Sequence, residues 1–434
     1  YPGFHPEKLV SPPLEGGDKE GVVGKPDLVV VGNFIGLNNP EFKYVKDQNI
    51  PYKSYPEALE EFVVKKNSIV CVGTYGKTTS AALLAWILER AHYEPSYMAG
   101  GILGNFPDGV RATDANWSVL EGDEYPADRW NSRSKFFYYH PEYLLLTAAE
   151  WDHMDVFKTK DSFVGNFVEL AKSMPADGLV MACATGANIE EVISQAPCKV
   201  IKYEGLGADG QSDYKIEAKS TSSETTVFKI VNSSSSFAEE FETQLIGNHM
   251  LENACGAIAL ANEVGVPLDK IKEAVKTFKG AKRRLELRGK TSSGALVIDD
   301  LAHSPTKARA TLGALKEWYS SAKIYAVFEP NLGNRTEESL EYYDGAFESA
   351  DEVYLPRLSK VKTAVGEKRL DGPELAAHIA KTQPNVTYTE DDDALVKELD
   401  KQAQEGDIIA FLGSHGFRGM IEQLASSSAA QPAS

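Results

Sequence analysis

Residues 72–80, VGTYGKTTS, have the residue types of a phosphate-binding loop. In a turn between a strand and a helix, successive backbone N–H groups and the helix N-terminus bind phosphate oxygens. Gly73 and Gly76 would allow that close approach. Lys77 would reach the β- and γ-phosphates, and the Thr78 hydroxyl would bind magnesium. The alternative is a glycine-rich turn with a solvated lysine, and we favour phosphate binding. Because a loop lysine is solvated, we expect Lys77 to contribute little to stability.

Acidic residues follow two later strand-like segments, in LEGDEY (120–125) and EWDHMD (150–155). Ligands bind at the carboxyl ends of the strands in open α/β sheets. Carboxylate and imidazole groups at that place suit magnesium ions beside a triphosphate. The candidates are Glu121, Glu150, Asp152, His153 and Asp155. The alternative for each is a helix cap or a satisfied surface histidine. We favour function for Glu121 and His153, and both interpretations stay open for Asp152 and Asp155.

Three arginines lie in KRRLELRG, at a predicted domain boundary: Arg283, Arg284 and Arg288. Arginine is well suited to hold a transferring phosphoryl group, and a boundary position would let it move onto the nucleotide when domains close. The alternative is a solvated linker. Two further clusters are Asp299, Asp300 and His303 after a strand, and Asn248, His249 and Asn253 at a helix start. Taken singly, most of these residues would be caps.

The elements that must position these residues alternate between short apolar strands and helical patterns, which predicts parallel α/β layers. We expect strands at 26–33 and 68–74, and a helix at 78–91. The strand predicted at 68–74 therefore leads directly into the phosphate loop. Residues 212–246 are expected to form an antiparallel addition at a sheet edge.

Length and composition predict several soluble domains. At 434 residues the chain is too long for one ordinary core. The expected domains are 1–64, 65–284 and 285–425, with a disordered tail at 426–434. The net charge of −18 opposes nucleic-acid binding.

The four cysteines are scattered, which indicates buried thiols in a reducing compartment. No apolar segment is long enough to span a bilayer. We therefore expect a cytoplasmic protein without a membrane partner, and a monomer.

Taken in order, these motifs resemble those of the Mur ligase family of peptidoglycan biosynthesis. GTYGKTT matches the G-T-x-G-K-T-[ST] loop of that family, EGDEY its acidic strand end, and EWDHMD its E-x-D-H motif. The GNHMLEN helix start, the arginine-rich joint and the DDLAHSPT strand end follow in the family order. The resemblance covers nearly the whole chain. It implies three α/β domains: a partial Rossmann-like N-terminal domain for the UDP-sugar, a central P-loop ATPase-like domain with a mostly parallel sheet, and a C-terminal Rossmann-like ligase domain.

The resemblance also implies the reaction. An ATP-dependent amide ligase would phosphorylate the carboxylate of UDP-N-acetylmuramate to an acyl phosphate, which an amine then attacks. DEYPADRWNSRSKF (123–136) is similar to the branch that adds L-alanyl-γ-D-glutamyl-meso-diaminopimelate in cell-wall peptide recycling. The alternative is the branch that adds L-alanine. Phosphotransferase activity, or nucleotide binding without catalysis, are alternatives of another class.

The implied residues follow the family motifs. Catalysis is assigned to Lys77, His153 and Arg284; ATP binding to Gly73, Thr74, Gly76, Lys77, Thr78, Thr79, Asn253, Arg284, Asp300 and His303; Mg²⁺ binding to Thr78, Glu121, Glu150 and His153; and UDP-sugar binding to Asn105. No base for the attacking amine is assigned. The chain departs from the pattern at Ser304, where these branches usually carry histidine, and at Met250, where the family usually has asparagine. We also expect the first βα unit of the family to be missing from this chain.

Overall fold

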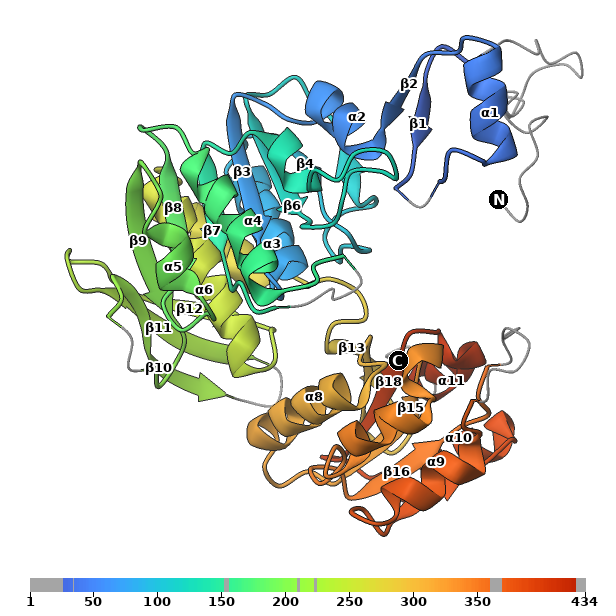
Figure 1. Ribbon diagram of the computed structural model, residues 1–434. Coiled ribbons are helices and arrows are strands. Elements are labelled where there is room, and N and C mark those ends of the chain that lie inside the picture. Colours follow the sequence, from blue (N-terminus) through green and yellow to red (C-terminus); the bar gives the residue numbers. More distant parts are fainter. Residues whose placement is uncertain are drawn as a thin grey trace, which may run out of the picture. The chain divides into compact units, whose positions relative to one another are not determined.

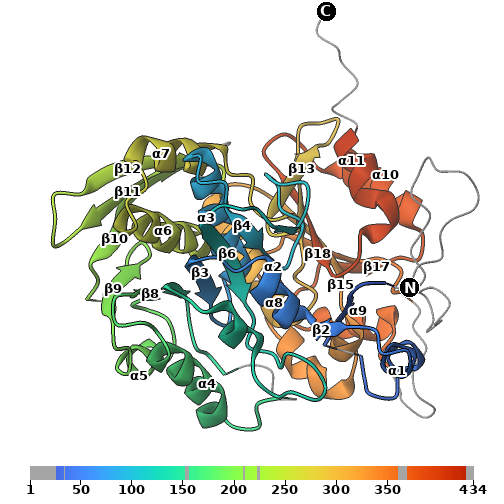
Figure 2. The same cartoon turned by 90° about the horizontal axis from the view of Figure 1, so that it is seen from above.

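The computed structural model describes residues 26–33, 35–151, 156–208, 211–221, 225–359 and 369–426 (Figures 1 and 2). These residues form two compact units. Unit 1 holds the residues up to Gln244 together with His249–Phe278, and unit 2 holds Leu245–Asn248 and the residues from Lys279 onward. Each unit is built on its own main sheet.

The main sheet of unit 1 has ten strands and is mostly parallel. Its strands, in spatial order, are β12 (Ala238–Thr243), β11 (Thr226–Asn232), β10 (Tyr214–Thr221), β9 (Lys199–Glu204), β8 (Leu179–Cys183), β7 (Tyr143–Leu146), β3 (Asn67–Val72), β6 (Trp117–Gly122), β4 (Ser96–Met98) and β5 (Val110–Arg111). The strands from β9 to β4 pair in parallel. β10, β11 and β12 form the antiparallel addition predicted at 212–246. The predicted α/β fold is therefore confirmed.

Helices cover both faces of this sheet, as Figure 2 shows. On one face lie α2 (Tyr55–Phe62), the 3₁₀ helix η2 (Lys135–Tyr139), α4 (Lys160–Lys172) and α5 (Ile189–Ile193). On the other lie α3 (Lys77–Arg90), α6 (Asn248–Glu263) and α7 (Leu268–Thr277). β3 is a continuous apolar segment because both of its faces are covered: Ile69 to Val72 are fully buried. It ends at Val72, two residues earlier than predicted, where Gly73 turns the chain into the loop.

A small parallel pair precedes the main sheet. β1 (Val29–Val31) and β2 (Tyr52–Ser54) are joined through α1 (Pro40–Asp47). The strand predicted at 26–33 is thus only three residues long. The Phe42 ring of α1 stacks on Trp130 with centroids 4.9 Å apart, which ties this βαβ segment to the main body of unit 1.

Unit 2 has a six-stranded sheet with helices on both faces. Its order is β13 (Glu286–Lys290), β14 (Leu296–Asp300), β18 (Ile408–Gly413), β15 (Ile324–Glu329), β16 (Glu352–Leu355) and β17 (Val386–Tyr388), and only β13 is antiparallel. One core forms under α8 (Pro305–Trp318), the 3₁₀ helix η4 (Glu337–Tyr343) and α9 (Gly372–Ile379). The other forms under α10 (Asp392–Gln402) and α11 (Met420–Ser426).

This order places a topological switch at β18. The chain leaves β14 and β15 toward one face, but it leaves β18, which lies between them, toward α11 on the other face. Ligands of open α/β sheets bind at the carboxyl ends of strands at such a point. The segments after Asp300 and Gly413 therefore frame the ligand-binding edge of unit 2.

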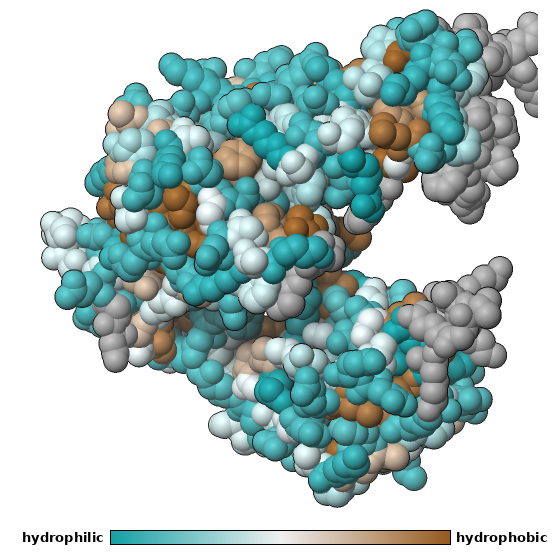
Figure 3. Space-filling view, in the orientation of Figure 1, coloured by the Kyte–Doolittle hydropathy of each residue, from teal (hydrophilic) through white to brown (hydrophobic). Residues whose placement is uncertain are grey.

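Three sequence expectations can be compared directly with the described residues. Cys71, Cys183 and Cys255 are buried and Cys198 is partly exposed, so the prediction of four buried thiols is wrong for Cys198. Ser426, the first residue of the predicted tail, is the last residue of α11, and the remainder of the tail lies outside the described residues. In the described part of the chain no helix has the length and apolar character needed to cross a membrane. The face drawn in Figure 3 is mainly hydrophilic with small hydrophobic spots.

Candidate active site

The loop after β3 requires glycine at two positions. Gly73 has φ 132° and Gly76 has φ 79°, values that other residues adopt only with strain. A Cβ on Gly73 would lie 2.1 Å from the Thr147 hydroxyl, and one on Gly76 would lie 2.3 Å from the Asn253 carboxamide oxygen. The loop is therefore closely packed between the end of β7 and helix α6.

Two hydrogen bonds of Thr74 fix the loop to the segment that follows β7. The Thr74 N–H donates to the Ala148 carbonyl at 3.0 Å, and the Thr74 hydroxyl donates to the Glu150 carbonyl at 2.8 Å. α3 starts immediately after Gly76, so the N–H groups of its first turn, which have no partner within the helix, face the loop. This is the geometry of an anion-binding helix N-terminus.

Lys77 is the first residue of α3 and is only 13% exposed. Its ammonium donates to the Gly73 carbonyl at 2.5 Å and lies 3.1 Å from a Glu124 oxygen. The Glu124 carboxylate is fully buried. The expectation of a solvated lysine is therefore wrong, and its place beside a buried carboxylate leads us to expect a contribution to stability. Glu124 was not predicted as a site residue. Its position three residues after Glu121, in the same acidic segment, is the feature of the sequence that could have indicated it.

Thr78 and Glu121 lie together at the mouth of the loop. The Thr78 hydroxyl donates to one oxygen of Glu121 at 2.9 Å, and the Gly100 N–H donates to the other at 2.6 Å. Hydroxyl and carboxylate oxygens are ligands suited to Mg²⁺. Thr78 lies in the first turn of α3, which follows the loop after β3, and Glu121 lies at the carboxyl end of the neighbouring parallel strand β6.

The other predicted metal ligands do not complete a site in the described residues. Glu150 is exposed and contributes only its carbonyl, to Thr74. His153, Asp152 and Asp155 lie outside the described residues. Within those residues no group of three or more His, Cys, Asp or Glu side chains could hold a metal ion. Thr78 and Glu121 are therefore the two predicted ligands that the structure brings together.

Helix α6 closes the loop from the other side. Asn253 is 7% exposed and packs against Gly76. The Thr79 hydroxyl lies 3.8 Å from the Met250 sulfur, and both residues are buried. Met250 thus fills core space beneath α3. Asn105 lies elsewhere in unit 1, where its amide donates to the Thr277 carbonyl at the end of α7, at 2.9 Å.

In unit 2, Arg283 has a structural position. Its guanidinium lies 3.1 Å from Asp299 and donates to the Gly413, Ser414 and His415 carbonyls at 2.6, 2.9 and 2.8 Å. Arg288 also binds Asp299, at 3.0 Å. Arg283 therefore fixes the end of β18 to the end of β14, across the topological switch.

Arg284 differs from its neighbours. It is exposed, and the residues on either side of it, Arg283 and Leu285, both have left-handed backbone conformations with φ 59° and 49°. Asp300 fixes this turn, because its carboxylate accepts from the Leu285 N–H at 2.8 Å. Of the three candidate arginines, Arg284 is thus the one whose side chain is directed to solvent rather than into the unit.

The polar residues at the end of β14 and just after it already make hydrogen bonds within unit 2. Asp300 is 8% exposed and also accepts from the Thr311 hydroxyl at 3.3 Å, and burial raises the pKa of its carboxyl group. The His303 ring nitrogen Nδ1 lies 2.7 Å from the Leu301 carbonyl. Burial, with Lys307 nearby, lowers the pKa of His303, so this imidazole is neutral near pH 7. Ser304 is the N-cap of α8 and accepts from the Lys307 N–H, which explains a serine at that position.

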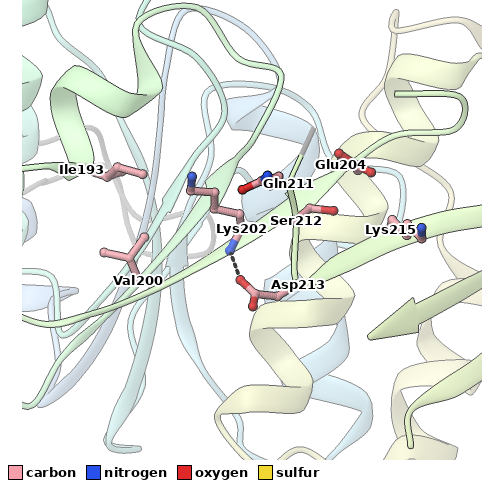
Figure 4. A pocket seen from close by; sticks show the side chains of 8 residues that line it. All are labelled: Ile193, Val200, Lys202, Glu204, Gln211, Ser212, Asp213 and Lys215. Atoms are coloured by element: carbon pink, nitrogen blue, oxygen red, sulfur yellow. Dashed lines mark hydrogen bonds between the residues drawn. The ribbon is translucent and has the colours of Figure 1, made fainter. Parts of the chain in front are cut away.

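A separate cavity of about 600 Å³ lies beside β9 and β10. Figure 4 shows its lining, with the Lys202 N–H donating to Asp213 at 2.8 Å. The lining residues are Ile193, Val200, Lys202, Glu204, Gln211, Ser212, Asp213 and Lys215. None of them is a predicted site residue, so this cavity is distinct from the phosphate loop.

Comparison with known proteins gives consistent matches along the chain. Residues 72–261 match the Mur ligase middle domain, and residues 283–415 match the domain described as Mur ligase, glutamate ligase domain. The sequence is 32% identical over 415 residues to UDP-N-acetylmuramate–L-alanyl-γ-D-glutamyl-meso-2,6-diaminoheptandioate ligase of Escherichia coli, covering 95% of this chain and 87% of that protein.

Two further matches involve another activity. The chain is 31% identical over 392 residues to UDP-N-acetylmuramate–L-alanine ligase of Desulfitobacterium hafniense, covering 90% of this chain and 84% of that protein. The crystal structure of UDP-N-acetylmuramate–alanine ligase from Thermotoga maritima superposes with a TM-score of 0.72, with 21% identity, covering 92% of this chain and 85% of that one. At 21% identity, the match to the Thermotoga maritima structure supports the fold alone.

Proposed function

This chain belongs to the Mur ligase family of ATP-dependent carbon–nitrogen ligases, and from that premise we propose that it joins UDP-N-acetylmuramate to L-alanyl-γ-D-glutamyl-meso-diaminopimelate. The observation that supports nucleotide chemistry is the pairing of Thr78 with Glu121 beside the loop of Lys77. The match to the Escherichia coli tripeptide ligase over 95% of the chain supports the amine substrate.

The reaction begins at the carboxylate of the sugar. One oxygen of that carboxylate attacks the γ-phosphorus of ATP, the bond to the β-phosphate oxygen breaks, and ADP leaves. The amine then attacks the acyl phosphate, loses a proton, and phosphate departs as the amide forms. Each step moves negative charge, so the residues that matter most are those that stabilise it.

The residues of unit 1 fit the first step. Lys77 and the N–H groups of the α3 N-terminus would bind the β- and γ-phosphates, with Gly73, Thr74, Gly76 and Thr79 shaping the loop. Thr78 and Glu121 would hold Mg²⁺, which would supply positive charge to offset that of the phosphates. We assign His153, with Glu150, to a second ion, and Asn253 to the nucleotide.

Unit 2 supplies the remaining assignments. The exposed Arg284 would stabilise charge on the transferring phosphoryl group, and Asp300 and His303 would contact the nucleotide. Asn105, in unit 1, is assigned to the UDP-sugar. We further propose that the protein is cytoplasmic and a monomer, and light scattering on the purified protein tests its oligomeric state.

A competition assay tests the substrate. The protein is given UDP-N-acetylmuramate, ATP and Mg²⁺ with equal amounts of L-alanine and the tripeptide, and products are identified by mass spectrometry. We expect the tripeptide adduct, with ADP and phosphate release that requires both the sugar and the amine. ADP release with the sugar alone and no ligated product would contradict ligation.

The second candidate is L-alanine ligation, favoured by the 31% identity to the Desulfitobacterium enzyme. In the same assay it would give the L-alanine adduct as the main product. A stable phosphorylated product would instead indicate a phosphotransferase, and tight ATP binding without turnover would indicate a binding protein.

A further inference from the structure

Glu124 is a fully buried carboxylate next to the lysine of the phosphate loop. Its two oxygens lie 3.1 and 3.5 Å from the Lys77 ammonium. Lys77 itself is 13% exposed, so the pair is largely shielded from water. Charges so placed interact more strongly than a surface pair. Whatever binds in the loop therefore meets an ammonium that already has a charge partner.

A chain of contacts that does not involve Lys77 holds the backbone of Glu124 in place. The Ser134 hydroxyl donates to the Glu124 carbonyl at 2.6 Å, and Asn166 of α4 donates to Ser134 at 2.8 Å. The neighbouring Asp123 pairs with Lys135 at 2.6 Å. The backbone at Glu124 is thus fixed by the fold, and its carboxylate extends from that fixed position to the Lys77 ammonium.

The donors of Lys77 can be counted. An ammonium has three N–H donors. One is used by the Gly73 carbonyl and one by Glu124, which leaves one for a phosphate oxygen. If Lys77 moved away entirely, it would leave a buried carboxylate without this partner, which is strongly unfavourable. We therefore expect Lys77 to stay in contact with Glu124 when a phosphate binds.

We propose that Glu124 is a positioning residue that shares the Lys77 ammonium with the phosphates of the bound nucleotide, weakening nucleotide binding so that ADP leaves readily. The proposal rests on the nucleotide role of Lys77 proposed above. The carboxylate and the phosphates would share one positive charge, and the two negative groups would repel each other. Removal of the carboxylate charge makes the whole ammonium available to the nucleotide.

The test is Glu124→Gln, which keeps the size of the side chain and an oxygen acceptor but removes the charge. We expect the Kd for ADP, measured by calorimetry, to fall by at least about fivefold. KM for ATP and kcat should fall together, because tighter ADP binding slows product release. The control is Asp123→Asn, which removes the adjacent negative charge that pairs with Lys135, and which should change the ADP Kd less than about twofold.

Several results would overturn the proposal. An unchanged or higher ADP Kd in Glu124→Gln does so, as does a lower kcat with KM for ATP unchanged, which marks a purely structural role. If Glu124→Gln does not fold, Ser134→Ala, which loosens the support of Glu124, should lower the ADP Kd by at least about twofold, and no change overturns the proposal. Wild-type protein that binds no ADP would refute both this inference and the proposed function. Wild-type binding with an unaffected Glu124→Gln variant refutes the inference alone.

Discussion

The Thr78 hydroxyl donates to Glu121 across 2.9 Å, from the first turn of α3 to the end of the neighbouring strand β6. The second Glu121 oxygen accepts from the Gly100 N–H, so both oxygens of the carboxylate are held in place before any ion binds. Such preorganisation favours a cation with strict geometric requirements.

Glu121→Gln should therefore raise the Mg²⁺ concentration for half-maximal ligation by about tenfold or more, because an amide is a weaker ligand without charge. Glu142→Gln is the matched control, since Glu142 lies before β7 at the opposite, amino end of the sheet. A Mg²⁺ titration of both variants checks this, and equal requirements in the two would remove Glu121 from the metal site.

Lys77→Met should destabilise unit 1 by about 3 kcal/mol, because it leaves the buried Glu124 without its ammonium partner. The double variant Lys77→Met with Glu124→Gln should recover most of that loss. Urea unfolding gives the free energies. Lys135→Met is the control: its partner Asp123 is 33% exposed, so water can solvate the carboxylate and the loss should stay below about 1 kcal/mol. Additive effects of the two changes at 77 and 124 would show that the pair is not coupled.

Adjacent arginines at the joint should behave in opposite ways. Arg283→Ala removes donors from Asp299 and from three carbonyls at and just after the end of β18, so we expect a loss of about 2 to 3 kcal/mol in unfolding free energy. Arg284→Ala should change stability by less than about 0.5 kcal/mol, since this side chain is exposed. Its kcat should fall by about 100-fold or more if it stabilises the transferring phosphoryl group. Unfolding curves and kcat are measured for both variants. An Arg283→Ala protein as stable as wild type would contradict the structural role of Arg283. A fully active Arg284→Ala enzyme would contradict the catalytic role of Arg284.

His303 should make unit 2 less stable in mild acid. Its pKa is lowered in the folded state, mainly by burial and by Lys307. Below the ordinary value of about 6.5 the unfolded chain therefore binds a proton that the folded chain does not. Stability is lost as the pH falls through 6.5, and the loss levels off once the pH is below the folded pKa.

His303→Gln removes this titration and can still donate to the Leu301 carbonyl. Between pH 8 and pH 5 the melting temperature of wild type should fall further than that of the variant. Asp300, whose pKa burial raises, is present in both proteins and cancels in the comparison. If the melting temperatures of the two proteins fell equally with pH, the lowered pKa of His303 in the folded state would be contradicted.

The spacing of residues along the chain was enough to predict much of this protein. The glycines and lysine of VGTYGKTTS, set between an apolar strand and a helix, indicated the loop because only that order places free N–H groups beside Lys77. The antiparallel addition near 212–246 was also predictable, since its alternating strands differ from the continuous apolar segments of the buried sheet. The pairing of Thr78 with Glu121 follows from two parallel strands ending at one edge.

Tertiary structure alone decided which polar groups became partners. Glu124 and Glu121 occur in one acidic segment, but their side chains point in different directions. Glu121 contacts Thr78, whereas the side chain of Glu124 is buried in the interior against Lys77. Arg283 and Arg284 are identical in type and adjacent. A left-handed backbone at Arg283 sends one guanidinium to Asp299 and leaves the other exposed. Sequence periodicity reports which face of an element is apolar, whereas burial of a charge depends on distant segments that come together only in the folded chain.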